Sequence, residues 1–308
     1  MQIEEAAQHA GEHAAETFNA GKTIIEHVSN SPLSEPLIHF PPVFGIDLSI
    51  TKHVLMLWLV AATIFVVVML SVRRYLAQER HIPSGFMNAL EAGVDFIREE
   101  IVRPNVGDKW TDTYTPLLVT LFLFILGANA MGLIPVFDVL NLLNHTVLHA
   151  PHDSFFARML EGGVTATANF NVTAALATIT FFMIIIAGAR AHGFVKHWKN
   201  LVPHGLPLPI TLFLIPIEIL GMLVRPFALT MRLAANMTGG HIAILAILSF
   251  VFIFNTQFGP AAGMGVGLFS LVLAALISAL EIIVVLVQAY VFTLLSAVFI
   301  GMAIHAHH

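Results

Sequence analysis

Long apolar stretches constrain this chain more than any other feature of its sequence. A helix needs about 20 mostly apolar residues to cross the hydrocarbon core of a bilayer. Three stretches meet that length, at residues 54–72, 116–136 and 171–189, and two longer ones follow at residues 206–258 and 264–304. The sequence therefore predicts an all-α integral membrane protein.

The two longest stretches exceed one perpendicular crossing, because a helix rises by about 1.5 Å per residue. Each is either a hairpin of two spans or a single, steeply tilted helix. The composition agrees with a membrane protein: 57% of the residues are hydrophobic and 11% are charged, whereas about a quarter are charged in soluble proteins. The net charge of −5, with dispersed basic residues, argues against nucleic-acid binding. The absence of cysteine excludes disulfides, thiolate catalysis and cysteine metal sites.

Basic residues in the loops predict the orientation, because cytoplasmic loops are enriched in lysine and arginine. Nine of them follow the first and third spans: Arg73, Arg74, Arg80, Arg98, Arg103, Lys109, Arg190, Lys196 and Lys199. The other side holds only Lys22, Lys52 and Arg158. We therefore expect the N-terminus outside and the C-terminus in the cytoplasm. Residues 1–50 are expected to form a polar segment outside the bilayer, and residues 51–308 a single membrane domain.

An amphipathic helix is predicted at about residues 84–103, between the first two spans. Its apolar side chains recur at helical spacing at Phe86, Leu90, Val94, Ile97 and Ile101. This pattern is typical of a helix that lies along a membrane interface. Packing against the chain's own spans and docking of another protein both remain open as its role.

Arginine is the most informative polar residue inside the apolar stretches. Arg232 lies in the segment PFALTMRLAANMTGGHIAIL, and no acid lies within a helical turn or two of it. A guanidinium cannot lose its proton to escape the cost of burial, so a functional role is expected. Arg225 immediately precedes Pro226, and it can either share that function or satisfy carbonyls that the proline frees.

Helix geometry places the other embedded groups around Arg232. Glu218 lies 14 residues earlier, close to four turns, which puts it on the same face and roughly 20 Å toward the cytoplasm. Asn236, four residues later, approximately shares that face. His241 falls on the opposite face and roughly 13 Å toward the outside.

The last helix runs back inward and brings two more polar groups. Gln288 is expected near the depth of Arg232, and Glu281 about 10 Å further out, at a depth similar to that of His241. Two embedded acids on opposite sides of an arginine indicate two ion pathways that stop short of each other. Proton relays in membranes are built from such groups.

The segment from Pro216 to His241 resembles subunit a of the F-type ATP synthase. The family pattern ALxxRLxxNMxxGH falls on Ala228, Leu229, Arg232, Leu233, Asn236, Met237, Gly240 and His241. Its final-helix pattern, an acid or histidine followed by a glutamine, falls on Glu281 and on QAYVFTLL at residues 288–295. Residues 121–135 and 166–177 are similar to the family's second and third spans. The sequence departs from the family at Asn169, where an aspartate is frequent, so Asn169 is expected to bind water and not to titrate.

The resemblance implies two long, steeply tilted helices where length alone leaves hairpins open. About five membrane helices are then expected, at about residues 54–75, 114–136, 170–190, 206–256 and 264–304. The resemblance also implies that Arg232 attracts the carboxylate of a passing c subunit and blocks direct proton flow between two half-channels. Protons would enter past Asn169, Asn171, His241 and Glu281, and leave past Glu218, with Gln288 and Asn236 beside the arginine.

The implied protein is a stator subunit without covalent chemistry or cofactor. Its implied partners are the ring of c subunits, b-type peripheral stalk subunits and the remaining ATP synthase subunits, and the implied location is the bacterial inner membrane. A secondary transporter for a small anion, coupled to protons through Glu218, Arg232 and Glu281, is the alternative. An intramembrane metalloprotease would need an HExxH motif, which the sequence lacks. His145, His149 and His152 lie in a polar loop, where solvated side chains are favoured over a metal site.

Overall fold

The computed structural model describes residues 49–78, 83–133, 166–199 and 207–305, together with residues 21, 38, 39 and 41. Most of the expected N-terminal segment and the loop that carries His145, His149 and His152 lie outside the described residues. The chain divides into two compact units. Unit 1 comprises residues 1–49, 135–164 and 238–282, and unit 2 comprises residues 50–134, 165–237 and 283–308.

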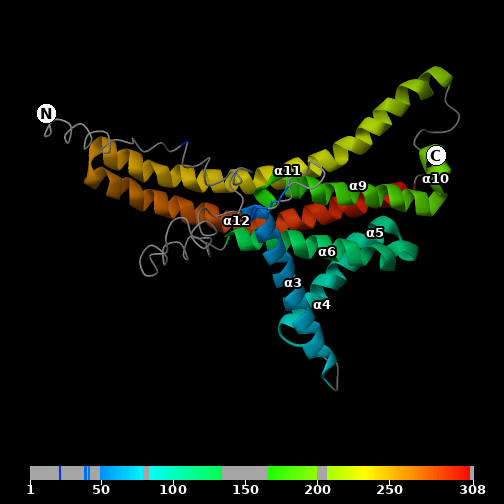
Figure 1. The fold of residues 1–308 in the computed structure, drawn as a ribbon, viewed down its shortest axis with the longest axis horizontal. Helices are drawn as coiled ribbons and strands as arrows, with labels where there is room; N and C mark the ends of the chain where they lie inside the picture. Colours follow the sequence, from blue (N-terminus) through cyan, green and yellow to red (C-terminus); the bar gives the residue numbers. More distant parts are fainter. Residues whose placement is uncertain are drawn as a thin grey trace. The chain divides into compact units, whose positions relative to one another are not determined.

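All the elements in the described part of the chain are helical (Figure 1). They are α3 (Lys52–Leu76), α4 (Phe86–Phe96), the π-helix η1 (Ile97–Val102), α5 (Arg103–Val106), α6 (Asp108–Leu133), the 3-10 helix η3 (Ala166–Ala168), α9 (Phe170–His192), α10 (Phe194–Lys199), α11 (Leu208–Phe258) and α12 (Pro260–Ile304). Within the described ranges, five helices are long and apolar enough to cross a membrane: α3, α6, α9, α11 and α12. The predicted all-α membrane class and the five membrane helices are confirmed.

Helices α11 and α12 are each continuous, with 51 and 45 residues. Neither stretch is a hairpin, so the alternative that length alone left open is settled in favour of single long helices. The turn between them is sharp: Gly259 has φ of 86°, a conformation that favours glycine. Pro260 follows as the first residue of α12, a position that suits its fixed φ and its missing N–H.

Two prolines lie inside α11, at positions 216 and 226. Proline removes a backbone hydrogen bond from the helix, but membrane helices tolerate this where nearby groups satisfy the freed carbonyls. The hydroxyl of Thr230 donates to the carbonyl of Pro226 at 2.9 Å. This bond lies in the turn just before Arg232, whereas the carbonyl that Pro226 leaves without a backbone donor is that of Met222, four residues earlier.

The amphipathic segment that follows α3 is divided into α4, η1 and α5. Pro104 lies in the first turn of α5, where it cannot donate the bond that an uninterrupted α-helix requires. The wider π-turn of η1 directly precedes it, which accounts for the division of the predicted single helix. Ile97, Ile101 and Val102 are almost completely buried, whereas α4 has no buried residue. The second half of the segment therefore packs against the chain's own helices.

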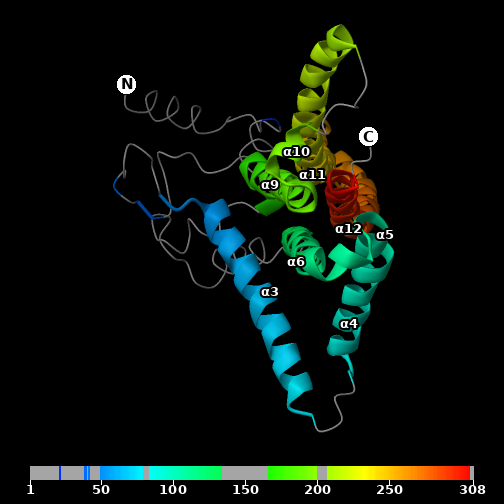
Figure 2. The same cartoon turned by 90° about the vertical axis from the view of Figure 1, so that its right-hand side faces the viewer.

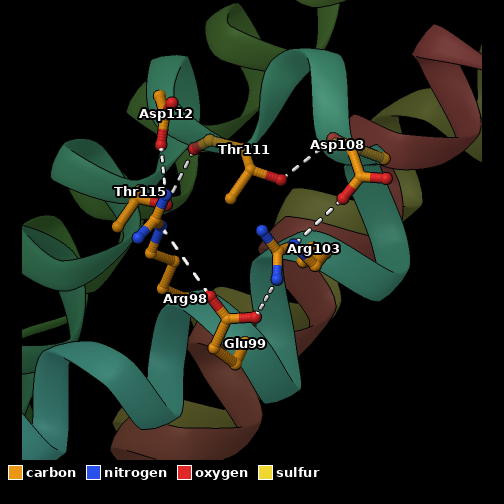
Figure 3. A network of polar contacts seen from close by, with 8 residues as sticks. Arg98, Glu99, Arg103, Asp108, Thr111, Asp112 and Thr115 are labelled. Carbon is orange, nitrogen blue, oxygen red and sulfur yellow. Dashed lines mark hydrogen bonds and ion pairs between the residues drawn. The ribbon is translucent and has the colours of Figure 1, made fainter.

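Charged side chains join this segment to the start of α6, as Figure 3 shows. The guanidinium of Arg98 donates to Asp112 at 2.8 Å. Arg103 pairs with Glu99 one turn earlier and with Asp108 at 3.0 Å. These side chains are substantially exposed, so we expect each pair to contribute at most about 1 kcal/mol.

The core of unit 2 lies where α6, α9, α11 and the C-terminal part of α12 meet. Its largest fully buried side chains include Tyr114 and Leu118 of α6, Leu233 of α11, and Phe292 and Ile300 of α12. Helices α6, α9 and the C-terminal part of α12 run side by side in both views (Figures 1 and 2). This packing fixes the segment of α11 that carries Arg232, because Leu233 is its neighbour in the chain.

A buried polar contact links α9 to α12 within this core. The hydroxyls of Thr180 and Ser296 lie 3.3 Å apart, and both residues are almost fully buried. Each hydroxyl can also donate to a carbonyl four residues earlier in its own helix. Thr180 lies 3.3 Å from the carbonyl oxygen of Leu176, and Ser296 lies 2.8 Å from that of Phe292. Hydroxyl pairs of this kind join helices in membranes.

Candidate ion-translocation site

Arg232 lies on an exposed face of α11. Leu229, three residues earlier, and Leu233, one residue later, are buried in the core of unit 2 with exposed fractions of 2% and 0%. Arg232 itself is exposed, so this core does not include its side chain. Among the described residues, none forms a hydrogen bond or ion pair with it. The chain therefore presents a permanent positive charge without a counter-charge of its own in the part that the structure describes.

The surface around this charge is apolar. Large hydrophobic side chains of α11 are exposed close to Arg232 in the sequence, among them Val224, Phe227 and Met231. An exposed arginine within such a surface needs a carboxylate or another anion to offset the cost of leaving water.

Asn236 and Gln288 form a polar bridge one turn after Arg232. The side-chain amide of Asn236 donates to the side-chain carbonyl of Gln288 at 2.9 Å. Gln288 is almost fully buried, with 3% of its surface exposed. The structure thus brings together α11 and α12 through two of the residues that the sequence singled out.

In unit 1, Glu281 is buried beside His241. The exposed fraction of Glu281 is 4%, and its Oε1 lies 3.9 Å from Nδ1 of His241. That oxygen has no hydrogen bond to any described residue. The histidine side chain is the more exposed of the two, at 24% against 6% for the side chain of the acid. A buried acid with a more accessible imidazole beside it is an arrangement suited to passing protons inward.

Gly240 makes this position of Glu281 possible. A Cβ at residue 240 would overlap Oε1 of Glu281, and it would also lie 3.1 Å from Cγ. The carboxyl therefore rests on the bare backbone of α11. No atom lies within 4 Å of the Cβ position of Gly239, so the two adjacent glycines differ in role.

Glu218 and Arg225 lie on the N-terminal half of α11. Glu218 is partly exposed and forms no ion pair with a described residue. Arg225 places its guanidinium carbon 5.5 Å from the ring centre of Phe299, within the range of a cation–π contact. This contact links α11 to α12 in unit 2, which favours a structural role for Arg225.

Asn169 and Asn171 lie at the beginning of α9. The side-chain oxygen of Asn169 accepts a hydrogen bond from the backbone N–H of Asn171 at 2.9 Å, so Asn169 is the N-cap of the helix. Asparagine and aspartate cap helices equally well, which explains why asparagine is acceptable at this position. The side chain of Asn171 is exposed.

Sequence reasoning missed a buried pair close to this cap. Asn129 of α6 and Thr167 of η3 are both fully buried, and the hydroxyl of Thr167 donates to the amide oxygen of Asn129. The amide nitrogen of Asn129 has no partner among the described residues. The signal that could have found it is a lone asparagine within the apolar stretch at residues 116–136.

The fold and these polar groups define a polytopic helical membrane protein with ionisable residues in its long apolar helices. The family model described as ATP synthase A chain matches residues 54–301. The chain belongs to this family. Membership confirms the resemblance found in the sequence, and it leaves the anion-transporter alternative without support.

Similar proteins cover almost the whole chain. A protein of Chlorobium luteolum named ATP synthase subunit a 2 is 39% identical over 303 residues, which cover 96% of this chain and 79% of that protein. A protein of the same name from Prosthecochloris aestuarii is 38% identical, with 97% of this chain and 83% of the relative covered. The ATP synthase subunit a of Chlorobium phaeobacteroides is 36% identical over 99% of this chain and 80% of its own length.

Proposed function

We propose that this chain is the proton-translocating stator subunit of the ATP synthase membrane sector. The observation that carries the proposal is Arg232, a fixed charge on an exposed apolar helix face, with no counter-charge among the described residues. The chain belongs to the ATP synthase A chain family, and a rotor carboxylate is the counter-charge that fits. Proton flow is thereby coupled to rotation and to ATP synthesis.

Protons enter from outside through His241 and Glu281. The imidazole is the more exposed of the two, so it receives a proton from water and the buried carboxyl takes it further. Asn169 and Asn171, at the beginning of α9, bind water on the outer entry path in this proposal. The proton then protonates a carboxylate of the c ring, which becomes neutral and can turn into the lipid.

Arg232 acts on the ring carboxylate after a nearly complete turn. Its positive charge favours the ionised form of the carboxylate, so the proton is released on the cytoplasmic side of the chain's surface. Glu218 accepts this proton and passes it to the cytoplasm. The charge of Arg232 also repels protons that would cross directly between the two half-channels. Asn236 and Gln288 hold each other beside the arginine and keep its surroundings polar.

The remaining features follow from this role. No bond other than that to a proton changes in this chain, so it is not an enzyme by itself. The two long helices lie steeply tilted along the c ring, and b-type stalk subunits hold the chain against rotation. We place it in the bacterial inner membrane, with residues 1–50 outside and the C-terminus in the cytoplasm.

Replacement of Arg232 tests the proposal. Arg232→Ala in the assembled complex is expected to abolish ATP-driven proton pumping into inverted membrane vesicles, because the rotor carboxylate loses its partner. Met231→Ala is a matched control, since Met231 is also exposed on the same helix but carries no charge. Normal pumping by the Arg232→Ala complex, with the subunit present at normal levels, would refute the proposed role.

A further inference from the structure

A small cavity lies where the first membrane helix ends and the amphipathic segment begins. Its volume is about 230 Å³. It is bounded by the last turns of α3 and the first residues of α4, two helices that also contact each other. The lining residues are Ser71, Arg74, Tyr75, Gln78, Ser84, Phe86 and Met87.

Among the residues that the structure describes, the polar part of this lining consists of hydrogen-bond donors and includes no carboxylate. Arg74 provides a guanidinium, Gln78 an amide, and Ser84 a hydroxyl. A guanidinium binds a phosphate through two parallel hydrogen bonds, a geometry that no other side chain reproduces. The described lining is therefore suited to a phosphate group.

Arg74 has no anionic partner among the described residues. The arginines of the following segment differ in this respect, because Arg98 pairs with Asp112 and Arg103 pairs with Glu99 and Asp108. Arg73 and Arg74 both lie in the last turn of α3, where a positive charge also suits the helix dipole. Of these two arginines, only Arg74 lines the cavity. The helix dipole acts on both alike, so it does not account for the difference between them.

The apolar part of the lining favours a lipid over a free ion. Phe86 and Met87 are its large apolar lining residues, and Phe86 has an exposed fraction of 56%. Leu70 of α3, one position before the lining residue Ser71, is also exposed, at 50%. Acyl chains can follow this surface into the bilayer from a headgroup held at the end of α3. Basic pockets beside membrane helices are typical sites for anionic headgroups.

We propose that the cavity binds the phosphodiester headgroup of an anionic glycerophospholipid, with Arg74 as its main ligand. The lipid connects the end of α3 to the start of α4 and so fixes the angle at which the amphipathic segment leaves the membrane helix. This site is separate from the residues of proton transfer. It depends on the chain being a membrane protein and not on the proposed path of protons.

Native mass spectrometry of the full chain in detergent tests this site. Phosphatidylglycerol is titrated against the unmodified chain, against Arg74→Gln and against Arg73→Gln. The last variant is the matched control, because it removes an adjacent exposed charge that does not line the cavity. Arg74→Gln loses the charge-assisted hydrogen bonds, which is expected to raise the dissociation constant of the tightest bound lipid by about tenfold or more. Arg73→Gln is expected to change this dissociation constant by less than about twofold.

Two further arms identify the ligand and separate shape from charge. Ser84→Phe fills the cavity without altering the net charge, and it should weaken lipid binding as Arg74→Gln does. A large excess of inorganic phosphate should leave the bound phosphatidylglycerol in place, since free phosphate lacks the acyl chains. Equal weakening by both arginine variants would overturn the proposal and indicate general surface charge. Displacement by inorganic phosphate would overturn it in favour of a free-anion site.

Discussion

At the scale of single residues, the chain places one side chain on the bare backbone of another residue. Glu281 rests on Gly240 within unit 1. A glycine is required at position 240 and not at position 239, because the neighbouring Gly239 has open space at its own Cβ position. The family pattern contains this glycine immediately before the histidine, and the close approach of the carboxyl gives a physical reason for it.

Replacement of either glycine by alanine should therefore have different consequences. Gly240→Ala is expected to push the carboxyl of Glu281 away from His241 and to lower the rate of proton pumping by on the order of 10- to 100-fold, as small misplacements of reacting groups do. Gly239→Ala is the control, and it should pump nearly as the unmodified complex does. ATP-driven acidification of inverted vesicles measures both. Equal effects of the two variants would contradict the role assigned to residue 240.

The bridge between Asn236 and Gln288 leads to a prediction about stability. Asn236→Leu leaves the carbonyl of the buried Gln288 without its donor, which should cost about 0.6 to 2 kcal/mol in a membrane interior. Adding Gln288→Leu removes the orphaned group and should restore part of the loss. Thermal unfolding of the purified subunit compares Asn236→Leu, Gln288→Leu and the double variant with the unmodified chain. Additive losses would show that the two amides do not interact.

At the scale of elements, the short helix α10 folds back on the end of α9. Gly193 makes the turn, with φ of 86°, and His197 then lies directly against Gly188, where any Cβ would overlap the imidazole ring. His197 is 6% exposed. Burial lowers the pKa of His197 below its usual range, and the charge of nearby His192 lowers it further. The neutral imidazole is therefore the form that packs.

The docking of α10 should depend on pH. Its contribution to stability is complete above the pKa of an undocked histidine, about 6.5, and it decreases as the pH falls from there toward the lower pKa of the docked ring. Amide hydrogen exchange in α10 should accelerate between about pH 7.5 and about pH 5.5, after correction for intrinsic rates. His197→Phe should remove this dependence. Exchange that responds to pH equally in both proteins would point to other groups.

At the scale of the whole molecule, the sequence predicted what depends on local composition. The five membrane helices and the embedded positions of Arg232 and Glu281 follow from the length and polarity of apolar stretches. Packing between distant segments was not predictable in this way. The burial of Asn129 against Thr167, and the fit of His197 on Gly188, arise only when separate helices pack.

The division of the amphipathic segment has a different explanation. Hydrophobic spacing predicted a single helix over residues 84–103, but Pro104 at its end alters the hydrogen bonding of the preceding turns. The spacing of apolar side chains carries no information about a π-turn. The role of Arg232 also exceeds what one chain can reveal, because its counter-charge belongs to another protein in our proposal.

The orientation of the chain is testable with single cysteines, since the natural sequence has none. Lys109 and Phe258 are both exposed, and the distribution of basic loops predicts that they lie on opposite sides of the membrane. A membrane-impermeant maleimide should label Lys109→Cys only in inverted vesicles. It should label Phe258→Cys only in spheroplasts, whose outer face is exposed to the reagent. Labelling of both from one side would reverse or reject the predicted topology.

Cross-linking tests most directly whether the counter-charge of Arg232 is a rotor carboxylate. Met231→Cys, on the exposed apolar surface beside the arginine, is combined with a cysteine one helical turn from the ionisable carboxylate of the c subunit, and mild oxidation follows in native membranes. A disulfide between the two subunits is expected. Leu233→Cys, at a buried position, should form none. Absence of the Met231→Cys product in a complex that still pumps protons would contradict the account.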